Sequence, residues 1–288
     1  MSNAAEVSCV WPARAVLGEG PCWDRRDNAL MWVDIKGERL HALDLANGAQ
    51  ASWTPPARIF SLDVPPPAWT TPAGAARWFI GCTASGFCWI GVSDDGIVEH
   101  PIAHPEPGAK ENRFNDGKAG PDGRYWAGTM DDGETRPLGA LYAFSPDGSY
   151  ARIDAGYVVS NGPAFSPDGR TLYHTDSARR VIYAFDLDAD GAVSGRRTFC
   201  QFSDQDGYPD GMTTDRAGNL WVAMWDGARL QKLSPAGERM GHIAIPAKRP
   251  TSCAFANDEQ SLLYVTSAAI GAPPEDTLAG GLFRVDLR

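Results

Sequence analysis

The sequence has 288 residues and a formal net charge of −10, from 26 lysines and arginines against 36 aspartates and glutamates. This length corresponds to one large domain or two small ones, and with 43% hydrophobic residues either could bury a sizeable core. No apolar run reaches the roughly 18 residues of a membrane-spanning helix, and an acidic chain lacks the basic surface that binds nucleic acids or anionic lipids. We therefore expect no membrane and no nucleic-acid partner, but a small molecule.

The cysteines and the N-terminus indicate a cytoplasmic protein. None of the six cysteines belongs to a C-x-x-C pair, and a chain of this length does not need disulfides for stability. The N-terminus has no basic start followed by an apolar stretch, so no secretory signal is expected. Residues 1–5 are interpreted as an expression tag or a disordered segment and are left out of the fold argument. We expect a monomer or a weak homodimer.

Glycine and proline are frequent throughout the chain, with 31 and 22 residues respectively. The longest stretch free of both is 170–190, and it contains two apolar bursts rather than a helical stripe. Long helices are therefore not expected. This disfavours a Rossmann sheet and an α/β barrel, because both need a helix of about ten or more residues between strands. The chain should be nearly all β.

One apolar strand pattern with a central aromatic marker recurs along the chain. The markers are separated by 47, 47, 47, 48 and 43 positions, which is the period expected of propeller blades. We therefore predict an all-β, six-bladed β-propeller in which the markers are core residues. The markers are Trp32, Phe79, Trp126, Tyr173, Trp221 and Tyr264. Their strands are expected at 30–33, 78–80, 125–127, 172–174, 220–222 and 263–265, and partner strands at 39–45, 86–92, 140–144, 181–187, 230–233 and 282–287.

The two ends of the chain are expected to share the last blade. The final unit ends at Arg288 with little chain left for an outer strand, whereas 7–11 precedes the first unit with nothing of its own to pair with. We predict that this N-terminal strand closes the ring, which leaves no free sheet edge at the seam. Residues 1–288 would then form a single domain.

Inner strands line the channel of a propeller, so equivalent residues from different blades converge on the axis. Counting 11 to 13 residues back from the markers reaches a polar residue in five of the six units, and the register of the second unit is left open. Carboxylates and amides gathered without a matching lysine would repel one another, a cost that a bound cation offsets. All-oxygen donors predict one divalent ion, with Ca²⁺, Mg²⁺, Mn²⁺, Fe²⁺ and Zn²⁺ all open. The polar residues are Glu19, Asn115, Asn161, Asp210 and Ser252.

Five short motifs, in order and at blade spacing, resemble the regucalcin/gluconolactonase family of sugar lactonases. The likeness covers nearly the whole chain and is nearest to bacterial aldonolactonases. The motifs are Leu17-Gly18-Glu19-Gly20-Pro21 with Trp32-Val33-Asp34, Asn112-Arg113-Phe114-Asn115-Asp116-Gly117, Gly128-Thr129-Met130, Ser160-Asn161-Gly162-Pro163 and Tyr208-Pro209-Asp210-Gly211-Met212.

The resemblance implies a six-bladed propeller whose single divalent ion is held by Glu19, Asn161 and Asp210, the residues that the spacing also selects. It implies substrate contacts from Arg113 and Asn115. Glu134 would be an acidic lid residue, in a segment one residue longer than the family pattern.

The activity implied is hydrolysis of aldono-1,4- or 1,5-lactones, such as glucono-, xylono- or arabinonolactone, to aldonic acids. The metal would polarise the lactone carbonyl and activate water, with Asp210 as ligand and general base. Met130 and Trp225 could give an apolar wall for the sugar ring. Two other functions stay open, a calcium-binding regulatory propeller without catalysis and a promiscuous esterase or phosphotriesterase. Arg113 and Asn115 favour catalysis, because a structural ion needs no donors aimed at an adjacent cavity.

Overall fold

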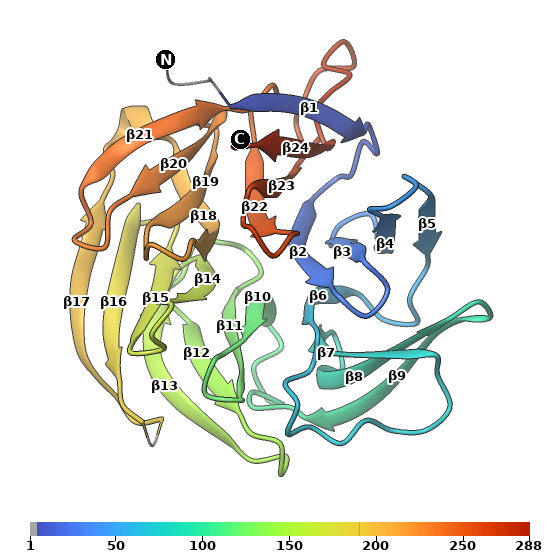
Figure 1. Ribbon diagram of the computed structural model, residues 1–288. Helices are drawn as coiled ribbons and strands as arrows, with labels where there is room; N and C mark the ends of the chain where they lie inside the picture. Colours follow the sequence, from blue (N-terminus) through green and yellow to red (C-terminus); the bar gives the residue numbers. More distant parts are fainter. Residues whose placement is uncertain (1–4, 190) are drawn as a thin grey trace.

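The computed structural model describes residues 5–189 and 191–288, and it confirms the six-bladed β-propeller (Figure 1). Six four-stranded antiparallel sheets surround a central axis, and the only helix in the described part of the chain is the short 3₁₀ helix η1 (Asp204–Asp206). No helix within these residues is long and apolar enough to cross a membrane. Of the segment interpreted as a tag, residues 1–4 lie outside the described residues.

Blades one to five are each built from four consecutive strands, numbered in chain order. Blade one comprises β2 (Gly18–Asp24), β3 (Ala29–Asp34), β4 (Arg39–Asp44) and β5 (Gln50–Trp53); blade two β6 (Ile59–Asp63), β7 (Arg77–Thr83), β8 (Gly86–Ser93) and β9 (Gly96–Ala103); and blade three β10 (Asn112–Ala119), β11 (Tyr125–Asp131), β12 (Gly139–Phe144) and β13 (Tyr150–Tyr157). Blade four comprises β14 (Ser160–Phe165), β15 (Thr171–Asp176), β16 (Val181–Leu187) and β17 (Val193–Gln201), and blade five β18 (Tyr208–Thr214), β19 (Leu220–Trp225), β20 (Arg229–Leu233) and β21 (Arg239–Ala244).

Blade six joins the two ends of the chain, as predicted. It comprises β22 (Pro250–Phe255), β23 (Leu262–Ser267), β24 (Leu282–Asp286) and, as its outer strand, β1 (Glu6–Trp11). The pairing of β1 with β24 is antiparallel, from Glu6 opposite Asp286 to Trp11 opposite Leu282. The strand at the start of the described chain and the strand near its end thus belong to one sheet, while the assignment of residues 1–288 to a single domain stays a prediction.

Each inner strand contains a β-bulge. In β2 the pairing with β3 skips Gly20 and Pro21, and in β14 the pairing with β15 skips Gly162 and Pro163. Both glycines have positive φ, 52° and 75°, and a proline loses nothing at an unpaired position because it has no N–H. Bulges re-aim side chains next to functional sites. Equivalent shifts occur in β6, β10, β18 and β22.

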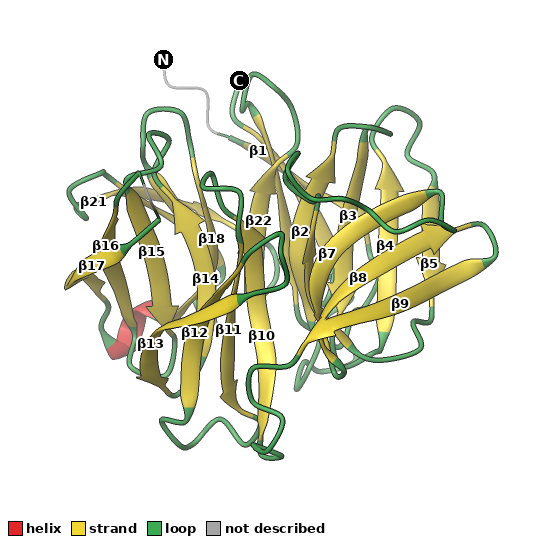
Figure 2. Cartoon of the chain, turned by 90° about the horizontal axis from the view of Figure 1, so that it is seen from below, coloured by secondary structure: helices red, strands yellow, loops and turns green. Residues whose placement is uncertain are grey.

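Glycines let the inner strands of neighbouring blades approach closely around the axis, along which these strands run (Figure 2). A Cβ added at Gly211 in β18 would lie 2.2 Å from Ser252 Oγ and 2.9 Å from Ser252 Cα in β22. A Cβ at Gly128 in β11 would lie 1.8 Å from Ser160 Oγ in β14. These distances are too short for real contacts, so the close approach of the blades depends on the missing side chains.

The six aromatic markers are core residues, as expected, with exposed fractions between 0% and 6%. Aromatic contacts also link neighbouring blades. Phe87 of blade two stacks on Phe144 of blade three with ring centroids 4.0 Å apart, and Trp126 of blade three meets Phe165 of blade four edge to face at 5.8 Å. Such pairs add to the stabilisation from apolar burial. All six cysteines are free.

An arginine pair fixes the segment that leads into β18. The carboxylate of Asp206 in η1 accepts hydrogen bonds from Arg229 Nη2 at 2.9 Å, from Arg239 Nη1 and Nη2 at 2.9 and 2.8 Å, and from Ser203 Oγ at 2.7 Å. Its side chain is only 12% exposed. These bonds, chiefly those from Arg239, hold the pKa of Asp206 well below its usual range.

Replacing Gly211 by alanine should destabilise the protein by about 1–3 kcal/mol, because the new methyl group overlaps the backbone of β22. Urea unfolding measures the change. Gly108→Ala is the matched control, since nothing lies within 4 Å of its added Cβ and its φ is not positive. Equal stability of the two variants would contradict the tight blade contact.

Asp206→Asn should cost about 1–3 kcal/mol of unfolding free energy at neutral pH, because two arginines lose their carboxylate partner. The folded-state pKa is lowered, so this stabilisation is fully present above about pH 4 and is lost as the pH falls through the folded pKa. The stability difference between wild type and variant, measured by urea unfolding from about pH 7 to about pH 3, should therefore shrink on acidification. A constant difference would show that the charge of Asp206 is not what stabilises this segment.

Candidate functional site

A cavity of about 490 Å³ opens at one end of the central channel, and all six predicted site residues line it. The described residues that line the cavity come from blades one, three, four, five and six, and none comes from blade two. This volume is in the usual range for small-molecule sites. The predicted residues brought together here are Glu19, Arg113, Asn115, Glu134, Asn161 and Asp210.

The bulges explain why a constant sequence spacing locates these residues only to within one or two positions. Glu19 and Asn161 are the last paired residues before their bulges, opposite Val33 and Thr175. Asn115 and Asp210 each lie one position after the last paired residue of their strand, and so within the bulge itself. Ser252, which the same count selects, is buried against Gly211 and does not line the cavity.

The side chain of Asn161 is fixed at both ends of its amide. Its Nδ2 donates to Ser177 Oγ at 2.9 Å, and its Oδ1 accepts from Asn115 Nδ2 at 2.8 Å. Ser177 in turn donates to the carbonyl oxygen of Pro209 at 2.6 Å, which ties blade four to the strand that carries Asp210. An amide oxygen has two lone pairs, so Oδ1 retains one for a further partner in the cavity.

Arg113 and Asn115 form one chain of hydrogen bonds with Asn161. Arg113 Nη1 donates to Asn115 Oδ1 at 2.7 Å, and Asn115 Nδ2 also donates to the carbonyl oxygen of Ser160 at 2.8 Å. Both N–H groups of the Asn115 amide are thus used within the protein. The predicted substrate contact from Asn115 would have to come from the second lone pair of its oxygen. Asn115 therefore also positions the proposed metal ligand Asn161.

Glu134 lies at the rim of the cavity, in the turn between β11 and β12, with φ of 58°. One of its carboxylate oxygens is 3.7 Å from Arg113 Nη2, and Asp132 pairs more closely with Arg113 Nε at 2.8 Å. Burial lowers the pKa of Arg113, while both carboxylates oppose that shift. Arg113 is thus already paired with two acids from the neighbouring turn.

The buried carboxylates of Glu19 and Asp210 lie at the floor of the site with that of Asp116 nearby, and the positive charges of Arg113 and Lys118 offset this negative charge only in part. Glu19, Asp210 and Asp116 each accept a hydrogen bond from the backbone N–H of the following glycine, at 3.3, 3.0 and 2.8 Å. Burial raises the pKa of Glu19 and of Asp210 well above the usual range, and repulsion from Asp116 raises both further. Burial also raises the pKa of Asp116 to about 6. Low-dielectric surroundings make such partly compensated charge costly, so the donor set fits a divalent cation.

Asn161 is an essential part of that donor set. Within residues 5–189 and 191–288, no three His, Cys, Asp or Glu side chains form a metal-binding group by themselves. Two carboxylates from Glu19 and Asp210 and one amide oxygen from Asn161 make a hard, all-oxygen site with positions left for water.

The apolar wall is only partly as expected. Trp225 lines the cavity together with Tyr208, whereas Met130 is fully buried in β11 and is not among the lining residues. The expectation for Met130 was wrong because Met130, although it pairs with the cavity residue Arg113 across β10 and β11, is completely covered by its neighbours and exposes no surface to the cavity. Sequence analysis also missed Lys36 and Arg180, which line the cavity from turns outside the periodic strands.

Comparison with known proteins identifies the family. The family described as SMP-30/gluconolactonase/LRE-like region matches residues 17–269. A 6-deoxy-6-sulfogluconolactonase from Pseudomonas putida is 36% identical over 264 residues, which cover 91% of this chain and 87% of that protein. A solved calcium-binding protein, regucalcin, from Agrobacterium tumefaciens has a TM-score of 0.88 at 26% identity, covering 98% of this chain and 94% of its own. For a gluconolactonase from Xanthomonas campestris the TM-score is 0.78 at 26% identity, with 99% and 90% covered. The chain therefore belongs to the SMP-30/gluconolactonase family.

Proposed function

We propose that this protein is a metal-dependent lactonase that hydrolyses sugar lactones to aldonic acids. The observation that carries the proposal is the pair of buried carboxylates of Glu19 and Asp210, only partly offset by Arg113, beside the oriented amide of Asn161 in a cavity large enough for a sugar. Relatives named as gluconolactonase and sulfogluconolactonase support the reaction, and the relative described as a calcium-binding protein supports a divalent ion.

Glu19, Asn161 and Asp210 would hold the ion, whose identity among Ca²⁺, Mg²⁺, Mn²⁺, Fe²⁺ and Zn²⁺ is left to experiment. When bound, such an ion supplies Lewis-acid polarisation of an ester carbonyl and lowers the pKa of water. Among the described residues, Asp210 accepts its hydrogen bond on Oδ1, from the N–H of Gly211, so its other oxygen is available to take a proton from the attacking water. In the overall reaction one water adds to the acyl carbon, the ring C–O bond breaks, and the ring oxygen leaves as a hydroxyl.

Other residues of the cavity orient the sugar. The Arg113–Asn115 pair presents polar groups above the floor, and Glu134 at the rim can accept a hydrogen bond from a hydroxyl. Tyr208 and Trp225 offer ring faces to the C–H side of a sugar. A binding protein without catalysis needs only the ion site, so the adjoining cavity favours an enzyme over a calcium-binding regulator.

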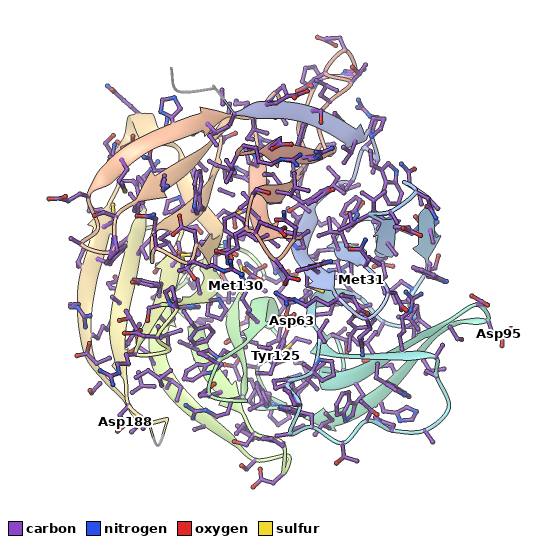
Figure 3. All side chains as sticks on the ribbon, in the orientation of Figure 1. Met31, Asp63, Asp95, Tyr125, Met130 and Asp188 are labelled. Carbon is purple, nitrogen blue, oxygen red and sulfur yellow. The ribbon has the colours of Figure 1, made fainter. Side chains whose placement is uncertain are left out.

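Asp210→Asn should lower kcat/KM for lactone hydrolysis by about 100-fold or more, because the substitution removes both a negative ligand and the proton acceptor. Acid release from D-glucono-1,5-lactone in a pH-stat measures it. Asp95→Asn is the matched control, since Asp95 lies in the exposed turn of the β8–β9 hairpin, far from the axis (Figure 3). An Asp210→Asn enzyme with near-normal turnover would exclude this mechanism.

Removing divalent ions with a chelator should abolish hydrolysis and lower Tm by about 5 °C, because a ligand that binds only the folded state stabilises it. Adding back each of the five candidate ions and following Tm identifies the metal.

Glu19→Gln should abolish the metal-induced rise in Tm, yet stabilise the metal-free protein by relieving repulsion with Asp210. Glu238→Gln, in the exposed turn between β20 and β21, should leave the rise unchanged. A rise in Tm that survives Glu19→Gln would place the ion elsewhere.

A further inference from the structure

The rim of the cavity carries cations that the proposed reaction does not use. Besides Arg113, the lining residues include Lys36 from blade one and Arg180 from blade four. Arg113 is neutralised by Asp132 and Glu134, as described above. On a chain with a net charge of −10, two further cations facing one cavity are not a consequence of composition.

Arg180 is held rigidly toward the cavity. It lies in the turn between β15 and β16 with φ of 55°, a left-handed conformation that costs roughly 1–2 kcal/mol for a residue other than glycine. Its carbonyl oxygen accepts hydrogen bonds from the backbone N–H of Phe202 at 2.9 Å and from Gln201 Nε2 at 3.0 Å. Its guanidinium group stacks on the ring of Tyr208, 4.1 Å from the centroid, and Tyr208 lines the same cavity.

The guanidinium group of Arg180 has unused hydrogen-bonding capacity. Its Nη1 contacts Asp204 at 3.0 Å, but the side chain of Asp204 is 91% exposed, so this ion pair contributes little. Its Nε is buried and has no hydrogen-bond partner in the part of the chain that the structure describes. The N–H groups of the guanidinium group that are not engaged by Asp204 are the ones left for a ligand in the cavity that Arg180 lines. Among the described residues, three other arginines share the unpaired Nε but do not line the cavity; they are Arg58, Arg229 and Arg284.

Lys36 faces Arg180 from across the ring, because blades one and four are opposite each other in the closed order of six. It lies in the exposed turn between β3 and β4, and no described carboxylate is within ion-pair distance of its Nζ. Asp226, the remaining acid of the rim, is paired with Arg249 Nε at 2.8 Å and Lys248 Nζ at 3.7 Å. The cations Lys36 and Arg180 are thus left to attract an anion into the cavity.

We infer that the natural substrate is a lactone that carries an anionic group, a phosphate, sulfonate or carboxylate, on the carbon most remote from the ester. This inference rests on the proposed lactonase function and names its substrate class. The ester lies at the acidic floor, where the metal ligands are, and the anionic group receives hydrogen bonds from Arg180 on its Tyr208 platform. Lys36 adds longer-range attraction. The anionic group itself does not react, and the hydrolysis is the one written above.

The test compares kcat/KM for D-glucono-1,5-lactone with that for the same lactone bearing a 6-phosphate or a 6-sulfonate, and with the lactone of glucaric acid. Wild type should favour one of the anionic lactones by about 10- to 100-fold, and the ranking of the three identifies the anion. Arg180→Gln should remove this preference while changing kcat/KM for the neutral lactone less than about 3-fold. Arg180→Lys should restore part of it, because a lysine keeps the charge but not the paired donors.

Two further variants separate local from global charge effects. Lys36→Gln, at an exposed position, should lower kcat/KM for the anionic lactone about 3- to 10-fold at low salt and hardly at all at high salt. Arg25→Gln is the control, because it also removes one positive charge. Arg25 directly follows β2, at the end of that strand away from Glu19, and pairs with the exposed Asp258. This variant should change kcat/KM for neither the neutral nor the anionic lactone. A wild-type enzyme without preference, or an Arg180→Gln variant that loses all lactones equally, would overturn the inference.

A binding measurement keeps this inference distinct from the proposed function. Isothermal titration with gluconate and with 6-phosphogluconate or 6-sulfogluconate should show tighter binding of an anionic acid, lost in Arg180→Gln. If no lactone is hydrolysed but this difference in binding is found, the lactonase proposal fails and the anion site stands. If lactones are hydrolysed and the acids bind alike, the anion site fails and the lactonase proposal stands.

Discussion

The repulsion between Glu19 and Asp210 is the interaction on which the rest of the site depends. Two carboxylates that lie far apart in the sequence are buried together at the end of the channel, each with only its neighbouring backbone N–H as partner. The charge of Arg113 and the backbone N–H groups offset this repulsion only in part, and tight packing of the inner strands, seen where Gly211 meets Ser252, holds the two acids in place. A divalent ion would turn the same arrangement from a cost into a binding site.

The oriented groups around this pair form a connected network rather than independent contacts. Arg113 holds Asn115, Asn115 holds Asn161, and Ser177 links Asn161 to the strand of Asp210. Preorganised donors of this kind need no rearrangement when charge develops on a substrate. The floor of the cavity is therefore acidic and rigid, while its rim at Arg180 is cationic.

The periodic aromatic residues were enough to predict six blades, their strands and the closing partner of the last one, because core packing repeats in every blade. The same period also predicted that Glu19, Asn161 and Asp210 meet on the axis, and all three line one cavity. It could not fix the register, since the bulge leaves two residues unpaired in β2 but one in β6, nor could it show that Met130 is completely buried. Arg180 was missed for a different reason, because turn residues follow no period and only the three-dimensional structure shows what they face.

The seam between β1 and β24 makes blade six dependent on both extremes of the chain. During synthesis, blades one to five can form as their strands emerge. The sixth sheet is complete only when β24 has emerged and can pair with β1. Blade one contacts blade six through β22 and β23, so β24 and β1 complete a sheet whose inner strands already lie against β2. The pairing of β1 with β24 therefore supports the cavity from a distance, because blade six packs against β2, the strand that carries Glu19.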